Sequence, residues 1–150
     1  MNRDQALQKA KHYCTYQERC HSEVKEKLYS FGLHKNETEE LLAELIEQNY
    51  LNEERFAIQF AGGRFRIKQW GMVKIKYELK QKQVSDYCIK KALSSIDEKD
   101  YIKTLQKLFS AKIKTLKSEK NIFIKKKKIN TYLLSKGFEA TLINDLLKSI

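Results

Sequence analysis

The sequence contains no proline, five glycines, one tryptophan and three cysteines among its 150 residues. Without proline nothing interrupts helices on that account, and the abundant lysine, leucine, isoleucine, glutamate and glutamine favour helix over strand. No apolar run reaches the ~18 residues needed to span a bilayer, and the polar start Met1–Asp4 lacks the apolar segment of a signal peptide. We therefore expect an all-α protein in the cytoplasm that does not contact membranes.

Residues that commonly support catalysis or metal binding are also scarce. Cys14, Cys20 and Cys88 are odd in number and form no CxxC pair, and a site built from Cys14, Cys20 and His21 would match no familiar zinc spacing. The sequence has no P-loop, HExxH or GxSxG motif. We expect structural thiols, no metal or other cofactor, and no enzymatic activity.

One hydrophobic pattern recurs three times with the same internal spacing. Two apolar residues one helical turn apart precede a turn residue and a further hydrophobe: Val24, Leu28, Gly32, Leu33; Ile75, Leu79, Gln83, Val84; and Ile129, Leu133, Gly137, Phe138. This spacing is typical of a helix that ends and packs onto the next one. We expect about nine helices in three tandem three-helix repeats, 1–49, 50–96 and 97–150, that form a binding surface by stacking.

Polar residues that cap helices predict where several of the helices begin. The expected caps are Asn2 or Asp4, Ser22, Asn36 with Glu39 as a capping box, Asn52 and Ser85. Gly62–Gly63 interrupts the helix that follows Asn52, at a cost of about 0.5–1 kcal/mol for each glycine relative to alanine. Either this helix bends there or another group packs closely against it.

The net charge of +11 is unevenly distributed along the chain. Residues 1–62 hold eight lysines and arginines against eleven acidic residues (net −3), whereas residues 63–150 hold twenty-two against eight (net +14). A basic excess confined to one part of the chain attracts polyanions in a salt-dependent way. A solvated, lysine-rich surface that keeps the protein soluble is the alternative interpretation.

The strongest candidates for binding residues combine cations with aromatic side chains. They are Arg64, Arg66, Lys68, Trp70, Lys74, Lys76, Lys80 and Lys82, followed by a second cluster of Lys125, Lys126, Lys127 and Lys128. Cations suit phosphates or carboxylates, and aromatic rings provide stacking or anchoring surfaces. Alternatively, Trp70 packs in the core and the cations face solvent. A helix-turn-helix that reads DNA sequence is disfavoured, because the helices near Glu37 and Thr141 lack the side chains that contact bases.

Three segments resemble the RecX family of bacterial recombinase regulators. The most specific is Tyr50–Ala57 (YLNEERFA), followed by Arg64, Gly71 and the run Ile75–Lys82 (IKYELKQK); Ser22-Glu23 with Leu28 and Gly32 also match. The chain departs from the family pattern at Gln83, where glycine is usual, and in the third repeat, which keeps only its hydrophobic frame.

The resemblance implies a fold and a role that composition alone does not. It implies three three-helix repeats in an elongated, curved array that binds the RecA filament on single-stranded DNA and restrains its ATP hydrolysis and strand exchange. We expect a monomer whose partners are RecA and single-stranded DNA, the latter contacted directly or through the filament. A free-standing, non-specific nucleic-acid-binding protein that acts without RecA is the alternative.

Overall fold

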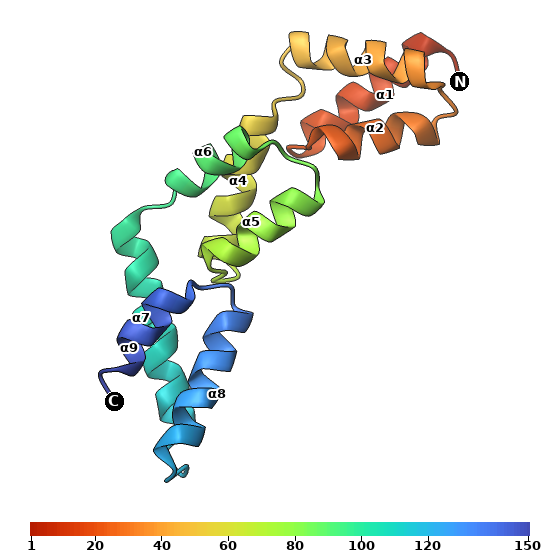
Figure 1. The fold of residues 1–150 in the computed structure, drawn as a ribbon. Coiled ribbons are helices and arrows are strands. Elements are labelled where there is room, and N and C mark those ends of the chain that lie inside the picture. The colour runs from red at the N-terminus through yellow and green to blue at the C-terminus, as the bar shows by residue number, and fades with distance from the viewer. The chain divides into compact units, whose positions relative to one another are not determined.

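The computed structural model describes residues 1–150 as nine α-helices without a strand, which confirms the all-α class (Figure 1). The helices are α1 (Arg3–Tyr16), α2 (His21–Ser30), α3 (Lys35–Glu47), α4 (Glu53–Arg66), α5 (Met72–Gln81), α6 (Asp86–Ser94), α7 (Glu98–Thr115), α8 (Ile122–Ser135) and α9 (Ala140–Leu147). None of them is both long and apolar enough to cross a membrane.

The chain folds into two compact units. Unit 1 comprises residues 1–60 and 79–92, and unit 2 comprises residues 61–78 and 93–150. In unit 1, helices α1, α2 and α3 pack against one another, and in unit 2 helix α8 packs against α7 and α9. The repeat boundaries expected from the sequence stay a prediction, because these units are defined by contacts and not by internal similarity.

The hydrophobic pattern that recurs three times lies in the core. Its apolar members are at most 7% exposed: Val24, Leu28, Leu33, Ile75, Leu79, Val84, Ile129, Leu133 and Phe138. The turn residue of each copy has a positive φ, at 85° for Gly32, 62° for Gln83 and 96° for Gly137. Each helix therefore ends in the left-handed conformation that glycine adopts at no steric cost.

Gln83 is the one member of this set whose side chain strains the left-handed turn. Replacing it with glycine is expected to raise the free energy of unfolding by about 0.5–1 kcal/mol, because relief of the strain exceeds the entropy that glycine loses on folding. Denaturant unfolding followed by circular dichroism measures the change. Gln81→Gly, at the last residue of α5, is the matched control and should destabilise. A loss of stability in Gln83→Gly would contradict the assignment of strain.

Three of the predicted helix caps are confirmed. The side-chain oxygens of Asn2, Asn52 and Ser85 each accept a backbone N–H from the residue three positions later, at 2.8, 2.9 and 3.3 Å. Asp97, where the third repeat was expected to start, makes the same bond at 3.0 Å. Each of these residues directly precedes its helix, α1, α4, α6 or α7. These bonds satisfy backbone N–H groups that the first helical turn leaves without a partner.

The predictions for Ser22 and Asn36 are wrong by two residues. Cys20 is the N-cap of α2, and the Ser22 hydroxyl instead donates to the carbonyl oxygen of Lys82 at 2.7 Å, within unit 1. His34 is the N-cap of α3, so Asn36 lies inside the first helical turn. In both helices a glutamate three residues after the cap accepts the N–H of the cap residue, and this bond sets the helix start.

The paired glycines of α4 do not end the helix, which continues to Arg66. A Cβ atom on Gly62 would lie 2.7 Å from two guanidinium nitrogens of Arg66, whereas nothing lies within 4 Å of a Cβ on Gly63. Of the two expectations, close packing is confirmed for Gly62, since the Arg66 side chain folds back along its own helix.

Arg55 in the Tyr50–Ala57 segment ties the start of α4 to the end of α1. Its Nε donates to the Glu18 carboxylate at 2.5 Å, and its Nη atoms donate to the side chain and carbonyl oxygen of Asn49, each at 3.3 Å. Asn49 has a φ of 63°, so the arginine holds a left-handed turn. The most specific part of the sequence resemblance therefore includes a structural contact.

Candidate functional site

Three predicted cations of unit 2 surround the chain's only tryptophan. The distance to the centroid of the Trp70 ring is 5.4 Å from the guanidinium carbon of Arg64, 5.6 Å from the Nζ of Lys68 and 4.5 Å from the Nζ of Lys74. Trp70 itself is half-buried. Together these four residues form what we call the Trp70 cluster.

A tight turn after α4 brings the cluster together. Arg64 and Lys68 are four residues apart and share one face, and the Lys68 N–H donates to the Arg64 carbonyl at 3.2 Å. Gln69 then takes a φ of 57°, which reverses the chain, and the Trp70 N–H donates to the same carbonyl at 3.1 Å. The indole therefore lies near the end of α4, close to Arg64 in its last turn and to Lys68 just after it.

The third cation comes from α5, whose start is held against the end of α8. The Gly71 N–H donates to the Lys136 carbonyl at 2.8 Å, and the Val73 N–H donates to the Gly137 carbonyl at 3.0 Å. A Cβ on Gly71 would lie only 2.3 Å from the carbonyl carbon and oxygen of Gly137. Two glycines therefore allow a backbone contact that fixes Lys74 beside the ring.

Lys136 is a fourth cation at this junction that sequence reasoning missed. Its Nζ donates to the Lys68 carbonyl at 2.9 Å, and the Lys74 Nζ lies 3.5 Å from the Ser135 carbonyl. Lys68, Lys74 and Lys136 form no ion pair with a carboxylate. The only sequence signal for Lys136 is its position in the recurring hydrophobic pattern. Lys136 directly precedes Gly137, just as Lys82 directly precedes Gln83 in the second copy.

Tyr101 supports the same junction from inside unit 2. Its hydroxyl accepts a hydrogen bond from the Met72 N–H at 2.9 Å and donates to the Glu139 carboxylate. The rings of Phe65 and Phe138 pack on it, with centroids 5.7 and 5.3 Å away. Burial raises the pKa of Tyr101 well above its ordinary value, and the bond to Glu139 adds to the shift, so the hydroxyl remains a donor.

The charge of the Trp70 cluster suits it to an anionic partner. Its cations lie within 5.6 Å of one ring centroid, so they repel one another, and an anion that binds among them relieves this repulsion. The indole adds a flat surface for stacking or apolar contact. The cluster can thus bind phosphate groups or carboxylates.

Four other residues predicted from the same stretch lie outside the cluster. The guanidinium of Arg66 lies along α4 against Gly62, and Lys76 is exposed on α5. Lys80 and Lys82 belong to unit 1, where the Lys82 Nζ lies 3.8 Å from the Glu23 carboxylate. The predicted residues from Arg64 to Lys82 are therefore divided between the two units, and their role in binding stays a prediction.

The second predicted cluster, Lys125–Lys128, occupies the first two turns of α8. Lys125 and Lys126 are half-buried, as expected for four cations that point around one turn, and the Lys128 Nζ lies 3.6 Å from the Glu119 carboxylate. A pocket of about 560 Å³ lies beside this turn, lined by Lys112, Ile124, Lys127, Lys128, Thr131, Tyr132 and Ser135. This pocket is a second basic site of unit 2.

The three cysteines are free and buried. Burial raises the pKa of the Cys14 and Cys20 thiols, which makes them weak nucleophiles at neutral pH. No three histidine, cysteine, aspartate or glutamate side chains gather as metal ligands would.

The chain is an all-α protein of nine helices without a strand, and cations gather around its one tryptophan as a candidate binding site. Regulatory protein RecX from Prosthecochloris aestuarii is 31% identical to the chain over 147 residues, which cover 97% of the chain and 93% of that protein. The chain belongs to the RecX family.

Further relatives and solved structures agree with this family. The model of the second three-helix domain of RecX matches residues 52–93, a range that includes the whole Trp70 cluster. Regulatory protein RecX from Clostridium perfringens is 32% identical over 129 residues, which cover 85% of the chain but only 60% of that protein. The crystal structure of RecX from Lactobacillus salivarius superposes with a TM-score of 0.87 at 25% identity, over 98% of the chain and 95% of that structure. A further crystal structure of regulatory protein RecX gives 0.86 at 20% identity, over 99% of the chain and 72% of that structure.

Proposed function

We propose that the chain is a non-enzymatic regulator that binds the RecA filament on single-stranded DNA and lowers its ATP hydrolysis and strand exchange in recombination and DNA repair. The observation that carries the proposal is the Trp70 cluster, an anion-binding arrangement inside the segment that matches the second RecX domain. A nucleoprotein filament presents both phosphates and protein carboxylates, and the cluster suits either group. The cluster would contact the filament first, with the pocket beside Lys127 and Lys128 as a second contact.

A free-standing nucleic-acid-binding protein is the second candidate. It is favoured by the indole with adjacent cations, because the same combination binds single strands without sequence preference. Such a protein would bind oligonucleotides tightly in the absence of RecA, and its affinity would fall steeply with salt.

The two candidates differ in their effect on DNA-dependent ATP hydrolysis by RecA. The chain, added below the RecA concentration to preformed filaments, is expected to lower the hydrolysis rate, because one regulator bound along a filament affects many protomers. A further excess of single-stranded DNA separates the candidates. A protein that only sequesters DNA loses its effect when DNA is plentiful, whereas a filament regulator keeps it. An unchanged rate with filaments present would rule out the proposed function.

A further inference from the structure

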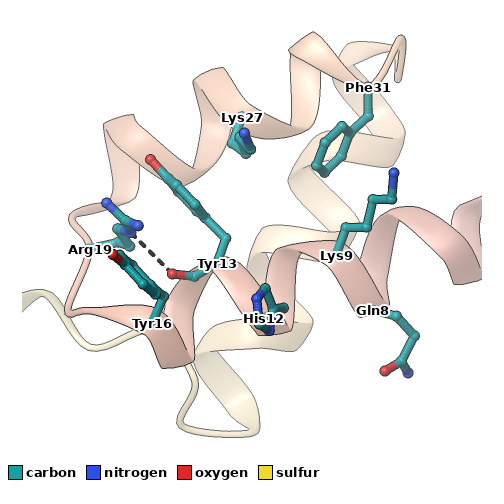
Figure 2. Close-up of a pocket in the computed structure, with 8 residues that line it drawn as sticks. All are labelled: Gln8, Lys9, His12, Tyr13, Tyr16, Arg19, Lys27 and Phe31. Atoms are coloured by element: carbon teal, nitrogen blue, oxygen red, sulfur yellow. Dashed lines mark hydrogen bonds between the residues drawn. The ribbon is translucent and has the colours of Figure 1, made fainter.

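Unit 1 contains a pocket of about 550 Å³ between α1 and α2, far from the Trp70 cluster in sequence. It is lined by Gln8, Lys9, His12, Tyr13, Tyr16, Arg19, Lys27 and Phe31. Figure 2 shows Arg19, Tyr13 and Tyr16 gathered at one end and Lys9 and Phe31 at the other, with Lys27 between Tyr13 and Phe31. None of the residues named for the sequence resemblance lines this pocket, although Lys27 and Phe31 lie between Ser22 and Gly32.

The cations of the pocket are placed by the aromatic rings that line it. The guanidinium carbon of Arg19 lies 3.7 Å from the centroid of the Tyr13 ring, and its Nε donates to the Tyr13 carbonyl at 3.1 Å. The Lys27 Nζ lies 5.2 Å from the centroid of Tyr13 and 5.8 Å from that of Phe31. Arg19 is therefore preorganised, with its Nη donors left for a ligand, since Nε makes the bond to the backbone.

The pocket is basic, although the charges of the unit around it balance. Lys9, Arg19 and Lys27 line it and no carboxylate does, whereas unit 1 as a whole has twelve basic and twelve acidic residues. The neighbouring Glu23 carboxylate is engaged elsewhere, by the Cys20 N–H at 3.0 Å and the Lys82 Nζ at 3.8 Å. Burial raises the pKa of the Tyr13 phenol, so the phenol stays neutral and leaves the positive charge of the pocket uncompensated.

We propose that this pocket binds a short acidic segment of a partner protein, with an apolar side chain seated among Tyr13, Tyr16 and Phe31 and flanking carboxylates on Arg19 and Lys27. Tyr16 is 77% exposed, so its ring offers an open surface to the apolar side chain. Guanidinium and ammonium groups at the rim match carboxylates in charge and geometry.

A polynucleotide fits the same pocket less well. Arg19 covers a face of the Tyr13 ring, which removes that face as a stacking surface for a base. A phosphodiester backbone would also continue beyond the three cations across unit 1, whose twelve basic and twelve acidic residues balance, so it gains little further attraction there. A short segment with a few carboxylates requires only the local positive charge, which is what unit 1 provides.

Fluorescence anisotropy with the full chain and a labelled peptide tests this proposal without RecA or DNA. The probe carries a central Leu-Phe pair with two aspartates on each side, and the matched probe has asparagine in place of every aspartate. We expect the aspartate probe to bind at least about tenfold more tightly, since the matched probe loses every charge-assisted contact. Lys27→Gln should weaken binding about fivefold and Tyr16→Ala about tenfold, because both side chains are exposed and line the pocket.

Lys25→Gln provides the matched control, because this exposed lysine of α2 does not line the pocket. It should leave the affinity for the aspartate probe unchanged. Equal binding of the two probes, or equal losses in Lys25→Gln and Lys27→Gln, would overturn the proposal. An oligothymidylate of equal charge is a further probe. If it bound more tightly than the peptide, and if its binding depended on Lys27 and Tyr16, the pocket would be a nucleic-acid site and the proposal would be overturned.

Discussion

Replacing Arg64, Lys68 and Lys74 together with glutamine is expected to weaken binding to RecA filaments by about a hundredfold. Each cation that bonds to a phosphate or carboxylate contributes about 1 kcal/mol, and 1.4 kcal/mol corresponds to a tenfold change in affinity. Co-sedimentation of the chain with filaments over a range of concentrations measures the loss. The dependence of affinity on salt should also become shallower, because fewer counterions are displaced on binding.

Lys99, Lys103 and Lys107 provide a control with the same change in net charge. All three are exposed in or near the start of α7 and lie outside the Trp70 cluster. Their combined replacement with glutamine should weaken binding much less, since it alters only the long-range field. If both triple variants lost the same affinity, net charge and not the cluster would account for binding. Far-UV circular dichroism confirms that each variant is folded before binding is measured.

The Gly71→Ala substitution should lower the free energy of unfolding of unit 2 on the order of 4 kcal/mol. The added Cβ would lie 2.3 Å from the carbonyl carbon and oxygen of Gly137, so the backbones must separate. Separation breaks the bonds from Gly71 to Lys136 and from Val73 to Gly137. Because α5 then shifts, Lys74 leaves the ring of Trp70, and filament binding should weaken as well.

Gly63→Ala is the matched control for this substitution. Gly63 lies inside α4 with nothing within 4 Å of an added Cβ, so alanine should stabilise the helix by about 0.5–1 kcal/mol. Urea unfolding followed by circular dichroism compares the two variants with the parent chain. An unchanged unfolding midpoint in Gly71→Ala would mean that α5 and α8 do not make the close backbone contact described above.

Local patterns in the sequence were sufficient to predict the helices and most of the core. Spacings of three to five residues show which side of a helix is buried, and this is why the three hydrophobic copies were placed correctly. Cap positions near Ser22 and Asn36 were wrong because several residues in a row can cap a helix. A glutamate three positions after Cys20 and His34 decides between them.

The candidate site could be predicted only where its residues are close in sequence. Arg64, Lys68, Trp70 and Lys74 fall within eleven residues joined by one turn, so their pattern of cations and an aromatic residue was visible. Lys136 was missed because a contact across more than sixty residues brings it there. Lys80 and Lys82 continue the same run of charge but belong to unit 1, so the run of charge along the sequence spans both units.

The most direct test of the central claim measures RecA ATP hydrolysis on preformed filaments with excess single-stranded DNA. The parent chain, the triple variant at Arg64, Lys68 and Lys74, and the triple control at Lys99, Lys103 and Lys107 are each added at the same concentration below that of RecA. We predict that the parent chain and the control lower the hydrolysis rate and that the cluster variant leaves it close to the rate of filaments alone. A cluster variant that lowers the rate as much as the parent chain would contradict the role of the Trp70 cluster in filament regulation.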